Sequence, residues 1–336
     1  MTRPTIKDVS RLASVSIGTV SNVVNGHPNV SERTRTKVLD AIDKLGYQAN
    51  RAARSLPAGQ TGLLGYRLPD EPHPNPAMDV FLHQVVEHAS SYGLELLLFA
   101  PKAGQSEIDA IASVQRRGGV DAFVLAGVDY HDPRIEYLSE RDVPFAVFGR
   151  LDADAKAAWV DVDGAAGTRS AVNHLFAMGR KSIGFVGWPE GSLTGDERHK
   201  GWRMGMEEHG FAINEDHIFR SLDNFSNGRQ LASSVISSGV DAVVCVTDEL
   251  ALGLMVGLRE KGVIPGGDIA LVGFDNIPAS AMVQPGLSTI KQPMGLVGEA
   301  LVVRLAEYLS GESTEGGLLL EPELVIRGSS SQVVNR

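Results

Sequence analysis

Length, composition and charge describe a globular protein with more than one domain. The chain has 336 residues, 43% of them hydrophobic, and a formal net charge of −10 at pH 7, which predicts about two to three domains. No segment reaches the roughly 18 apolar residues of a membrane span, and the N-terminus lacks the apolar core of a secretory signal, so we expect a cytoplasmic protein. The single cysteine, Cys245, excludes an intrachain disulfide, and no residue cluster has the spacing of a zinc site.

The charge is unevenly distributed along the chain. Residues 1–60 hold nine basic and four acidic groups, a net charge of +5, whereas the remainder carries a net charge of −15. Because nucleic acid is a polyanion, this asymmetry indicates a small module that faces phosphates, attached to a larger body that phosphates repel. A basic face that is merely solvated is the alternative interpretation of the charge alone.

Three short helices are predicted in the first 46 residues. Thr5 and Asp8 fit a capping box at the start of a helix over about 6–13. Ser16 can cap a second helix, and Ser31 begins a third. Two short helices joined by about three residues are typical of a helix-turn-helix, although periodicity alone also allows an unrelated three-helix bundle. The apolar residues expected at helical spacing in this segment are Ile6, Val9, Leu12, Ala13, Val20, Val23, Val24, Val38, Leu39, Ile42 and Leu45.

The same segment carries a series of short motifs at fixed intervals. These are Asp8-Val9, Val15-Ser16, Thr19-Val20-Ser21, Val23 to Asn25, Val30-Ser31, Thr34-Arg35, Leu45-Gly46-Tyr47, Asn50 and Ala53-Arg54-Ser55-Leu56. With them, residues 5–56 resemble the headpiece and hinge of the lactose/galactose repressor (LacI/GalR) family. The resemblance implies a DNA-binding headpiece over 1–46 and a hinge over 47–60. It also implies a homodimeric repressor whose second helix lies in the major groove of each half of a near-palindromic operator.

In the predicted second helix, Ile17, Gly18 and Asn22 match the positions with which the family reads bases. Asn22 can donate to and accept from a base edge, and Ile17 can contact a thymine methyl. Gly18 offers no side chain but allows the start of the helix to approach closely. Short polar side chains suit phosphate contacts, which position a protein without specifying sequence. That role falls to Thr19, Ser21 and Asn25, and Thr5 and Ser16 complete the DNA contacts expected of the headpiece.

Residues 50–56, NRAARSL, match the family's hinge, which folds into a short helix only when two copies meet on DNA. Leu56 matches the leucine that the family inserts into the minor groove, where an apolar wedge kinks the duplex. Ala49 stands where the family commonly has proline, a departure that predicts a looser approach to the hinge. The hinge residues expected at the DNA are Asn50, Arg51, Ala53, Arg54 and Leu56.

From Thr61 onward, apolar runs alternate with helical patterns in two series. This alternation predicts parallel sheets covered on both faces, and two series predict two similar α/β lobes. Predicted strands cover 63–69, 94–101, 122–128, 145–149, 182–188, 242–248 and 269–275, with a last strand, ELVIRGS, near the C-terminus. Helices are predicted near 78–92, 106–117, 132–141, 164–178, 197–209, 228–238, 249–261 and 294–309.

The family's body resembles periplasmic sugar-binding proteins. The resemblance therefore implies an all-α helix-turn-helix headpiece followed by an effector-binding and dimerisation body, residues 61–336, of two parallel-sheet lobes. Three crossovers would assign about 61–160 and 290–320 to the first lobe, and about 161–289 and 321–336 to the second. The tail SSSQVVNR contains no leucine heptad, so we do not expect a tetramer built by an added coiled coil.

The expected ligand site lies in the cleft between the lobes, because open parallel sheets bind ligands outside the carboxyl ends of their strands. Arg198, in RHKGW, matches the arginine with which the family binds effector hydroxyls, and Asp275, in VGFDN, matches its ligand carboxylate. Thr247 stands where the lactose repressor has asparagine, and Gln292 matches a polar group at the lobe crossover. The remaining candidates are Asn224 or Phe225, where the family places an aromatic ring, together with Asp70, Phe81, Arg150 and Asp248.

These residues also have a purely structural interpretation. Asp248 would then cap the helix that starts at Glu249, and Arg198 and Asp275 would only pair with each other.

Motifs for catalysis are absent from the sequence. There is no G-x-S-x-G elbow, no Walker lysine-serine ending and no dinucleotide fingerprint, and the nine histidines form no metal-spaced set. We therefore expect neither an enzyme nor a bound cofactor or metal. The prediction is a DNA-binding transcriptional repressor controlled by a sugar or oligosaccharide. The alternatives are the same type of regulator with a purine or nucleoside co-repressor, and an exported sugar-binding receptor, which would have no use for a DNA module.

Overall fold

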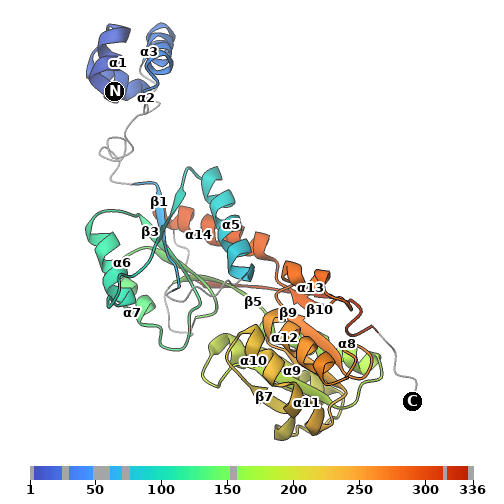
Figure 1. The fold of residues 1–336 in the computed structure, drawn as a ribbon. Coiled ribbons are helices and arrows are strands. Elements are labelled where there is room, and N and C mark those ends of the chain that lie inside the picture. Colours follow the sequence, from blue (N-terminus) through green and yellow to red (C-terminus); the bar gives the residue numbers. More distant parts are fainter. Residues whose placement is uncertain are drawn as a thin grey trace.

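A computed structural model describes residues 4–24, 30–47, 61–69, 76–151, 157–312 and 316–331. The N-terminal part is a bundle of three helices, α1 (Ile6–Ala13), α2 (Ile17–Val24) and α3 (Glu32–Leu45), and the rest forms two α/β lobes (Figure 1). The predicted fold class, a helical headpiece followed by two parallel-sheet lobes, is confirmed.

Local hydrogen bonds set the ends of the three headpiece helices. The Thr5 amide donates to Asp8 Oδ2 at 2.9 Å, as in the predicted capping box, and the Thr5 hydroxyl donates to the same oxygen. Ser16 Oγ accepts from the Thr19 amide at 3.0 Å. Gly46 ends α3 with a φ of 58°, a left-handed conformation that glycine adopts without strain. The sequence therefore encodes these helix ends locally.

The headpiece core is narrower than the apolar pattern predicts. Val9, Val20 and Val38 are fully buried at its centre. Leu12 and Leu39, both expected in the core, are instead 50% and 51% exposed. Each residue of a helix is turned by about 100° from the next, so Leu39 points away from the face that its neighbour Val38 buries. A bundle this small buries a narrower face of each helix than the predicted apolar stripe.

The sheet of the first lobe has six parallel strands in the order β11-β5-β4-β3-β1-β2. Its strands are β1 (Leu63–Arg67), β2 (Glu95–Phe99), β3 (Ala122–Ala126), β4 (Phe145–Phe148), β5 (Ala158–Val162) and β11 (Gly316–Leu320). Its helices are α5 (Pro76–Ser91), α6 (Glu107–Arg116), α7 (Pro133–Ser139) and α14 (Met294–Leu309). Helix α14 packs on α5 and against β3, β4 and β5, so this late segment belongs to the first lobe.

The sheet of the second lobe has the order β12-β10-β9-β8-β6-β7, with only β12 antiparallel. Its strands are β6 (Ile183–Gly187), β7 (Ile218–Arg220), β8 (Ala242–Cys245), β9 (Ala270–Phe274), β10 (Ser288–Lys291) and β12 (Glu323–Val325). Its helices are α8 (Gly164–Ala177), α9 (Leu193–Glu208), α10 (Phe225–Gln230), α11 (Ala232–Ser238), α12 (Asp248–Glu260) and α13 (Pro278–Met282), with a 3₁₀ turn at Glu215–His217. The chain passes between the sheets after β5, after β10 and after β11.

Burial explains why the central strands were predicted and why some of the outer strands were not. Every residue of β8 and β9 is buried, including Cys245, as the continuous apolar runs of a sheet covered on both faces require. In β5, by contrast, Trp159 and Asp161 alternate with buried residues, and β11 is a largely exposed edge strand. The apolar run of β5 is interrupted by Asp161, and that of β11 is only the three residues Leu318 to Leu320. Within the described residues, no helix is both long and apolar enough to cross a membrane.

Candidate functional site

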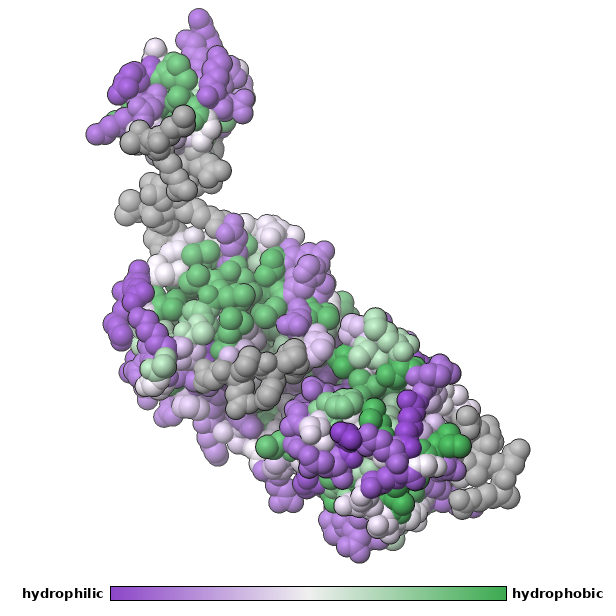
Figure 2. Space-filling model, viewed as in Figure 1, coloured by the Kyte–Doolittle hydropathy of each residue, from purple (hydrophilic) through white to green (hydrophobic). Residues whose placement is uncertain are grey.

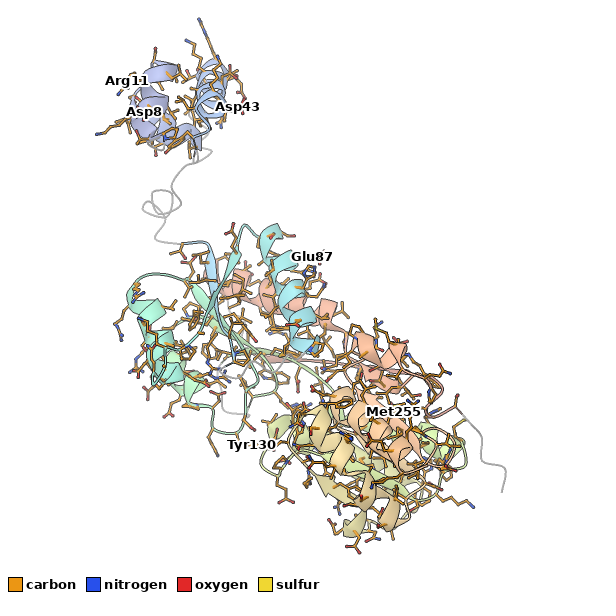
Figure 3. The ribbon with its side chains drawn as sticks, viewed as in Figure 1. Asp8, Arg11, Asp43, Glu87, Tyr130 and Met255 are labelled. Carbon is orange, nitrogen blue, oxygen red and sulfur yellow. The ribbon has the colours of Figure 1, made fainter. Side chains whose placement is uncertain are left out.

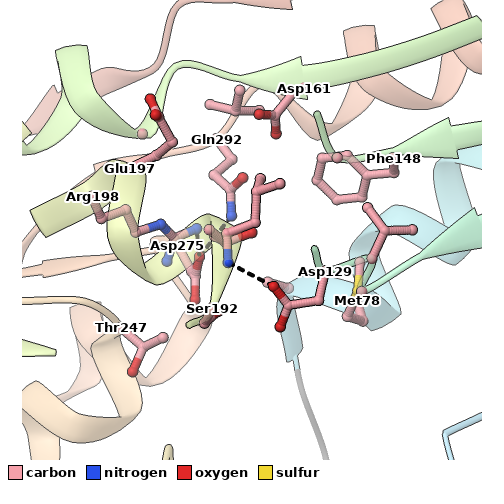
Figure 4. Close-up of a pocket in the computed structure, with 18 of the residues that line it drawn as sticks. Met78, Asp129, Phe148, Asp161, Ser192, Glu197, Arg198, Thr247, Asp275 and Gln292 are labelled. Atoms are coloured by element: carbon pink, nitrogen blue, oxygen red, sulfur yellow. Dashed lines mark hydrogen bonds and ion pairs between the residues drawn. The ribbon is translucent and has the colours of Figure 1, made fainter. Parts of the chain in front are cut away.

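A cavity of about 250 Å³ lies between the two lobes (Figure 4). Its lining residues end or follow β3, β4 and β5 in the first lobe, and follow β6, β8 and β9 in the second. The first turns of α5, α9 and α14 complete the wall. This is where parallel sheets place a ligand. The polar and aromatic lining residues are Asp129, Phe148, Asp161, Trp188, Ser192, Thr194, Glu197, Arg198, Thr247, Asp275 and Gln292.

Arg198 of α9 is fixed in the second-lobe wall by three neighbours. Its Nη1 donates to the carbonyl oxygen of Val246 at 2.6 Å, its Nη2 lies 3.7 Å from Asp275 Oδ1, and its guanidinium carbon lies 3.6 Å from the ring centroid of Phe274. Burial lowers the pKa of Arg198, and the nearby carboxylates oppose that shift. Arg198 Nε is buried and has no hydrogen-bond partner among the described residues. A ligand or water oxygen would satisfy it.

Asp275 faces Arg198 from the end of β9. Gln292 Nε2, at the crossover between the lobes, donates to Asp275 Oδ1 at 2.6 Å. Burial raises the pKa of Asp275 to about 7, against the opposing charge of Arg198. The φ of Asp275 is 106°, a conformation that is costly for a residue with a Cβ and that often occurs at binding sites. The structure therefore brings together Arg198, Asp275 and Gln292, as the resemblance implies.

Thr247 lines the same cavity and also caps the N-terminus of α12. Its hydroxyl oxygen accepts from the Leu250 amide as the N-cap of α12, and the hydroxyl donates to Asp223. Burial raises the pKa of Asp223, while the hydrogen bond from Thr247 and the charge of Arg198 lower it. Asp223 is absent from the cavity lining and lies behind Thr247.

Asp248 has a different role from both of those predicted for it. The helix begins at Asp248 and its N-cap is Thr247, so Asp248 does not cap a helix starting at Glu249. Its carboxylate is fully buried and accepts hydrogen bonds from the Ile277 amide, the Ser280 hydroxyl and the Thr289 hydroxyl. It connects α12 to the segment after β9 and does not line the cavity. Burial raises its pKa to about 6, against these hydrogen bonds.

Three further carboxylates line the cavity and were not among the predicted site residues. Asp129 follows β3, Asp161 lies in β5, and Glu197 precedes Arg198 on α9. Burial raises the pKa of Asp161, and the charges of Arg150 and Arg198 oppose it. Carboxylates accept pairs of hydrogen bonds, so this wall suits a ligand rich in hydroxyl donors. Among the described residues no group of three His, Cys, Asp or Glu side chains could hold a metal.

The rule for strand ends would have located Asp129 and also Phe148, an aromatic residue of the same cavity wall. Asp129 directly follows the predicted apolar run 122–128, and Phe148 lies in the predicted run 145–149 as the last residue of β4, so the rule for strand ends applied to both. Asp161 lies in a strand that the apolar pattern does not indicate. Glu197 has no signal of its own, since a charged residue in a helix is ordinary.

Several predicted ligand residues lie outside the cavity wall. Phe81 is fully buried in the first-lobe core and stacks on Phe148 with 4.8 Å between ring centroids. Asn224 caps α10 by accepting from the Asn227 amide, and Phe225 is 42% exposed. Arg150 lies behind the wall, in ion pairs with Asp161 and Glu197. Asp70 lies outside the described residues.

In the headpiece, the predicted base-reading residues share an exposed surface of α2. Ile17 is 45% exposed, and Gly18 and Asn22 are exposed. A Cβ at Gly18 would contact only Ser16 Oγ, at 3.7 Å. Of the other predicted DNA contacts, Thr5 and Ser16 are exposed and Thr19 and Ser21 are partly buried. Asn25 and the hinge residues Asn50, Arg51, Ala53, Arg54 and Leu56 lie outside the described part of the chain.

Comparisons with known proteins agree with both parts of this architecture. Residues 5–50 match the family model of bacterial regulatory proteins of the lacI family, and residues 172–330 match a periplasmic binding protein-like domain. An uncharacterized HTH-type transcriptional regulator in the aml 5′ region of Streptomyces limosus is 31% identical, covering 98% of this chain and 95% of the relative.

Solved structures show the same similarity over nearly the whole chain. The lac repressor dimer bound to operator and an anti-inducer superposes with a TM-score of 0.85 at 27% identity, covering 98% of this chain and 99% of that one. A complex of the transcriptional regulator CelR with cellobiose superposes with a TM-score of 0.75 at 28% identity, covering 97% of this chain and 100% of that one.

Proposed function

The chain belongs to the lacI family of bacterial regulatory proteins, and from that premise we propose that it is a repressor whose operator affinity is set by a neutral sugar bound between its lobes. The observation that carries the proposal is the meeting of Arg198, Asp275 and Gln292 at the cavity wall. As a regulator that acts on operator DNA, it would work in the cytoplasm.

The chemistry of the cavity supports a sugar over a charged ligand. Four carboxylates line it against one guanidinium, so a phosphate ester would meet repulsion whereas neutral hydroxyls would find acceptors. Phe148 and Trp188 line the cavity, and aromatic side chains can pack against the apolar side of a sugar. The relative CelR was solved with cellobiose, which is also a neutral carbohydrate.

Cavity size favours a single sugar ring. The cavity of about 250 Å³ lies below the roughly 300–1,000 Å³ that pockets for drug-sized ligands occupy. We therefore propose a monosaccharide and not an oligosaccharide. An exported sugar receptor is not favoured, because residues 5–50 match a DNA-binding module.

Helix α2 of the headpiece offers few side chains that can recognise specific bases. Asn22 can bond to a base edge, Ile17 can contact a thymine methyl, and Gly18 permits a close approach. Binding of a near-palindromic operator needs two headpieces, and the lac repressor structure is a dimer on operator. We propose that this chain also acts as a homodimer. Insertion of Leu56 into the minor groove stays a prediction.

Thermal unfolding of the full-length protein with single sugars tests the proposal. A bound ligand at about 100 times its dissociation constant adds about 2.7 kcal/mol of stability, so at least one of D-glucose, D-galactose or D-ribose should raise the Tm, and its 6- or 5-phosphate should not. The active sugar should also change affinity for the operator. Arg198→Ala should lose both responses but keep operator binding without sugar. A purine that raises the Tm where no sugar does would refute the proposed ligand class.

A further inference from the structure

Contacts across the cleft converge on the first turns of α9, the helix that carries Arg198. The Leu193 amide, at the start of α9, donates to Asp129 Oδ1 of the first lobe at 2.7 Å (Figure 4). The first amides of a helix have no partner within it, and negative charge is favourable there. A carboxylate of one lobe therefore satisfies the end of a helix in the other.

Arg150 makes a second contact across the cleft and bridges two carboxylates. It follows β4, and its Nη1 lies 3.2 Å from Glu197 Oε2 on α9. Its Nε lies 3.5 Å from Asp161 Oδ2 on β5. All three side chains are about three-quarters buried or more, so solvent screens this ion pair less than it screens an exposed one.

The backbone before Arg150 is specialised for this placement. Gly149 has a φ of 131°, and a Cβ there would lie 2.6 Å from Val128 Cγ2. Both the conformation and the close approach require glycine. The turn that directs Arg150 toward α9 is thus encoded in Gly149-Arg150.

A third contact involves Tyr130, which lies at the junction of the two lobes (Figure 3). Desolvation, followed by the charge of Asp196 and a hydrogen bond to it, raises the pKa of Tyr130. Asp196 is in the first turn of α9. Leu193, Asp196 and Glu197 therefore all contact the first lobe, and the next residue is the ligand-facing Arg198.

We propose that Arg150 is a positioning residue for effector binding: it holds Glu197 of α9 to Asp161 of the first lobe and so sets the lobe orientation in which the cavity binds its ligand. The proposal rests on the proposed function only in placing the ligand in this cavity. Asp129 and Glu197 have a double role, since they line the cavity and also make contacts between the lobes. Asp161 lines the cavity and anchors Arg150 within the first lobe. Arg150 itself is absent from the lining and acts through them.

The test compares full-length Arg150→Gln and Arg150→Lys with Arg141→Gln as the control. Arg141 is a first-lobe arginine whose pair with Glu140 is exposed. The first readout is hydrogen–deuterium exchange of residues 193–198 without ligand, and the second is the calorimetric affinity for whichever of D-glucose, D-galactose or D-ribose raises the Tm most. Arg150→Gln should speed the exchange and weaken the affinity, each about tenfold, which for the affinity is about 1.4 kcal/mol. Arg150→Lys should fall between, because an ammonium cannot engage two carboxylates as a guanidinium does.

A double-mutant cycle with Glu197→Gln separates the proposed contact from general damage. If Arg150 acts through Glu197, the double variant should exchange little faster than either single variant, and additive effects would overturn the proposal. Exchange and affinity of Arg150→Gln equal to those of Arg141→Gln would also overturn it. If no sugar stabilises the wild type, the proposed ligand fails, and the exchange measurements still decide the role of Arg150.

Discussion

Asp275 combines a left-handed backbone, a buried carboxyl group and a single cationic neighbour, Arg198. Its pKa is raised from 3.8 to about 7, chiefly by burial. The folded protein therefore retains a proton that the unfolded chain releases above about pH 4. Its contribution to stability is fully present below that pH and is lost as the pH rises through 7.

The free energy of unfolding should accordingly contain a falling component between about pH 4 and pH 7. One such group contributes a slope of up to about 1.4 kcal/mol per pH unit. Asp275→Asn cannot ionise, so its stability should fall less steeply than that of the wild type, by about 1 kcal/mol per unit. Urea denaturation at pH 4.5, 5.5 and 6.5 measures both slopes. Asp268→Asn in an exposed turn is the control, and equal slopes for Asp275→Asn and wild type would contradict the prediction.

Motifs in the sequence identified three residues that the structure places together in one cavity wall. Arg198, Asp275 and Gln292 lie in recognisable motifs, and the structure brings them together. Asp161 and Glu197 carry no local signal, because what makes them part of a site is the apposition of two lobes. Asp248 was expected at the ligand site because it follows Thr247 in the sequence. In the structure its carboxylate accepts three hydrogen bonds from other parts of the second lobe and does not line the cavity.

Among the elements, helices α8 and α9 show how closely packing constrains the second lobe. A Cβ added at Gly201 of α9 would lie 2.0 Å from the carbonyl oxygen of Ala165 at the start of α8. Thr168 of α8 donates to the Arg198 carbonyl oxygen at 2.7 Å in the same contact. Because Arg198 is on α9, this packing also positions a residue that lines the cavity.

Gly201→Ala should therefore destabilise the protein, since the clash is with backbone and no side chain can rotate away. The expected loss is on the order of 3 kcal/mol, the upper end for overpacking, measured by urea denaturation. Gly18→Ala is the matched control, because its Cβ would meet ordinary van der Waals distance only. Unchanged stability of Gly201→Ala would mean that the two helices can separate at little cost.

The strands that the sequence predicted most clearly are those whose two faces are both buried in the sheet. The central strands β8 and β9 are continuous apolar runs and were predicted. Four strands were not predicted. β5 alternates, β7 and β10 are only three and four residues long, and β11 is exposed at an edge, so local composition does not distinguish them from loops. Their partners are distant in sequence, as in the pairing of β5 with β11, and only the complete sheet determines them.

One edge of the first-lobe sheet is unusually apolar for a solvent-facing strand. β2 is the edge strand, its sequence is ELLLF, and Leu98 is 48% exposed. Figure 2 shows hydrophobic residues gathered on this side of the first lobe, between α6 and α5. Edge strands of this kind associate unless they are covered, which supports β2 as part of the proposed homodimer contact.

Leu98→Lys should therefore weaken the dimer, because it places a charge where apolar surface would be buried. We expect the dissociation constant of the dimer to rise about 100-fold, an effect of hot-spot size, measured by sedimentation equilibrium. Ile264→Lys, at a 62% exposed residue of the second lobe, is the control. A dimer of Leu98→Lys as tight as that of the control would exclude β2 from the interface.

For the molecule as a whole, charge separates the two binding functions. The first 60 residues carry a net charge of +5 and the remainder −15, and the cavity presents four carboxylates and one guanidinium. Operator binding should thus release counterions from DNA, whereas binding of a neutral sugar should release none.

Affinity for the operator should fall by about 10³-fold or more between 50 and 200 mM salt, as for proteins with six or more phosphate contacts. Sugar affinity, measured by calorimetry over the same range, should change less than about twofold, because a neutral ligand adds no charge to be screened. A flat operator dependence would contradict binding through phosphates, and a steep sugar dependence would show that the ligand is charged.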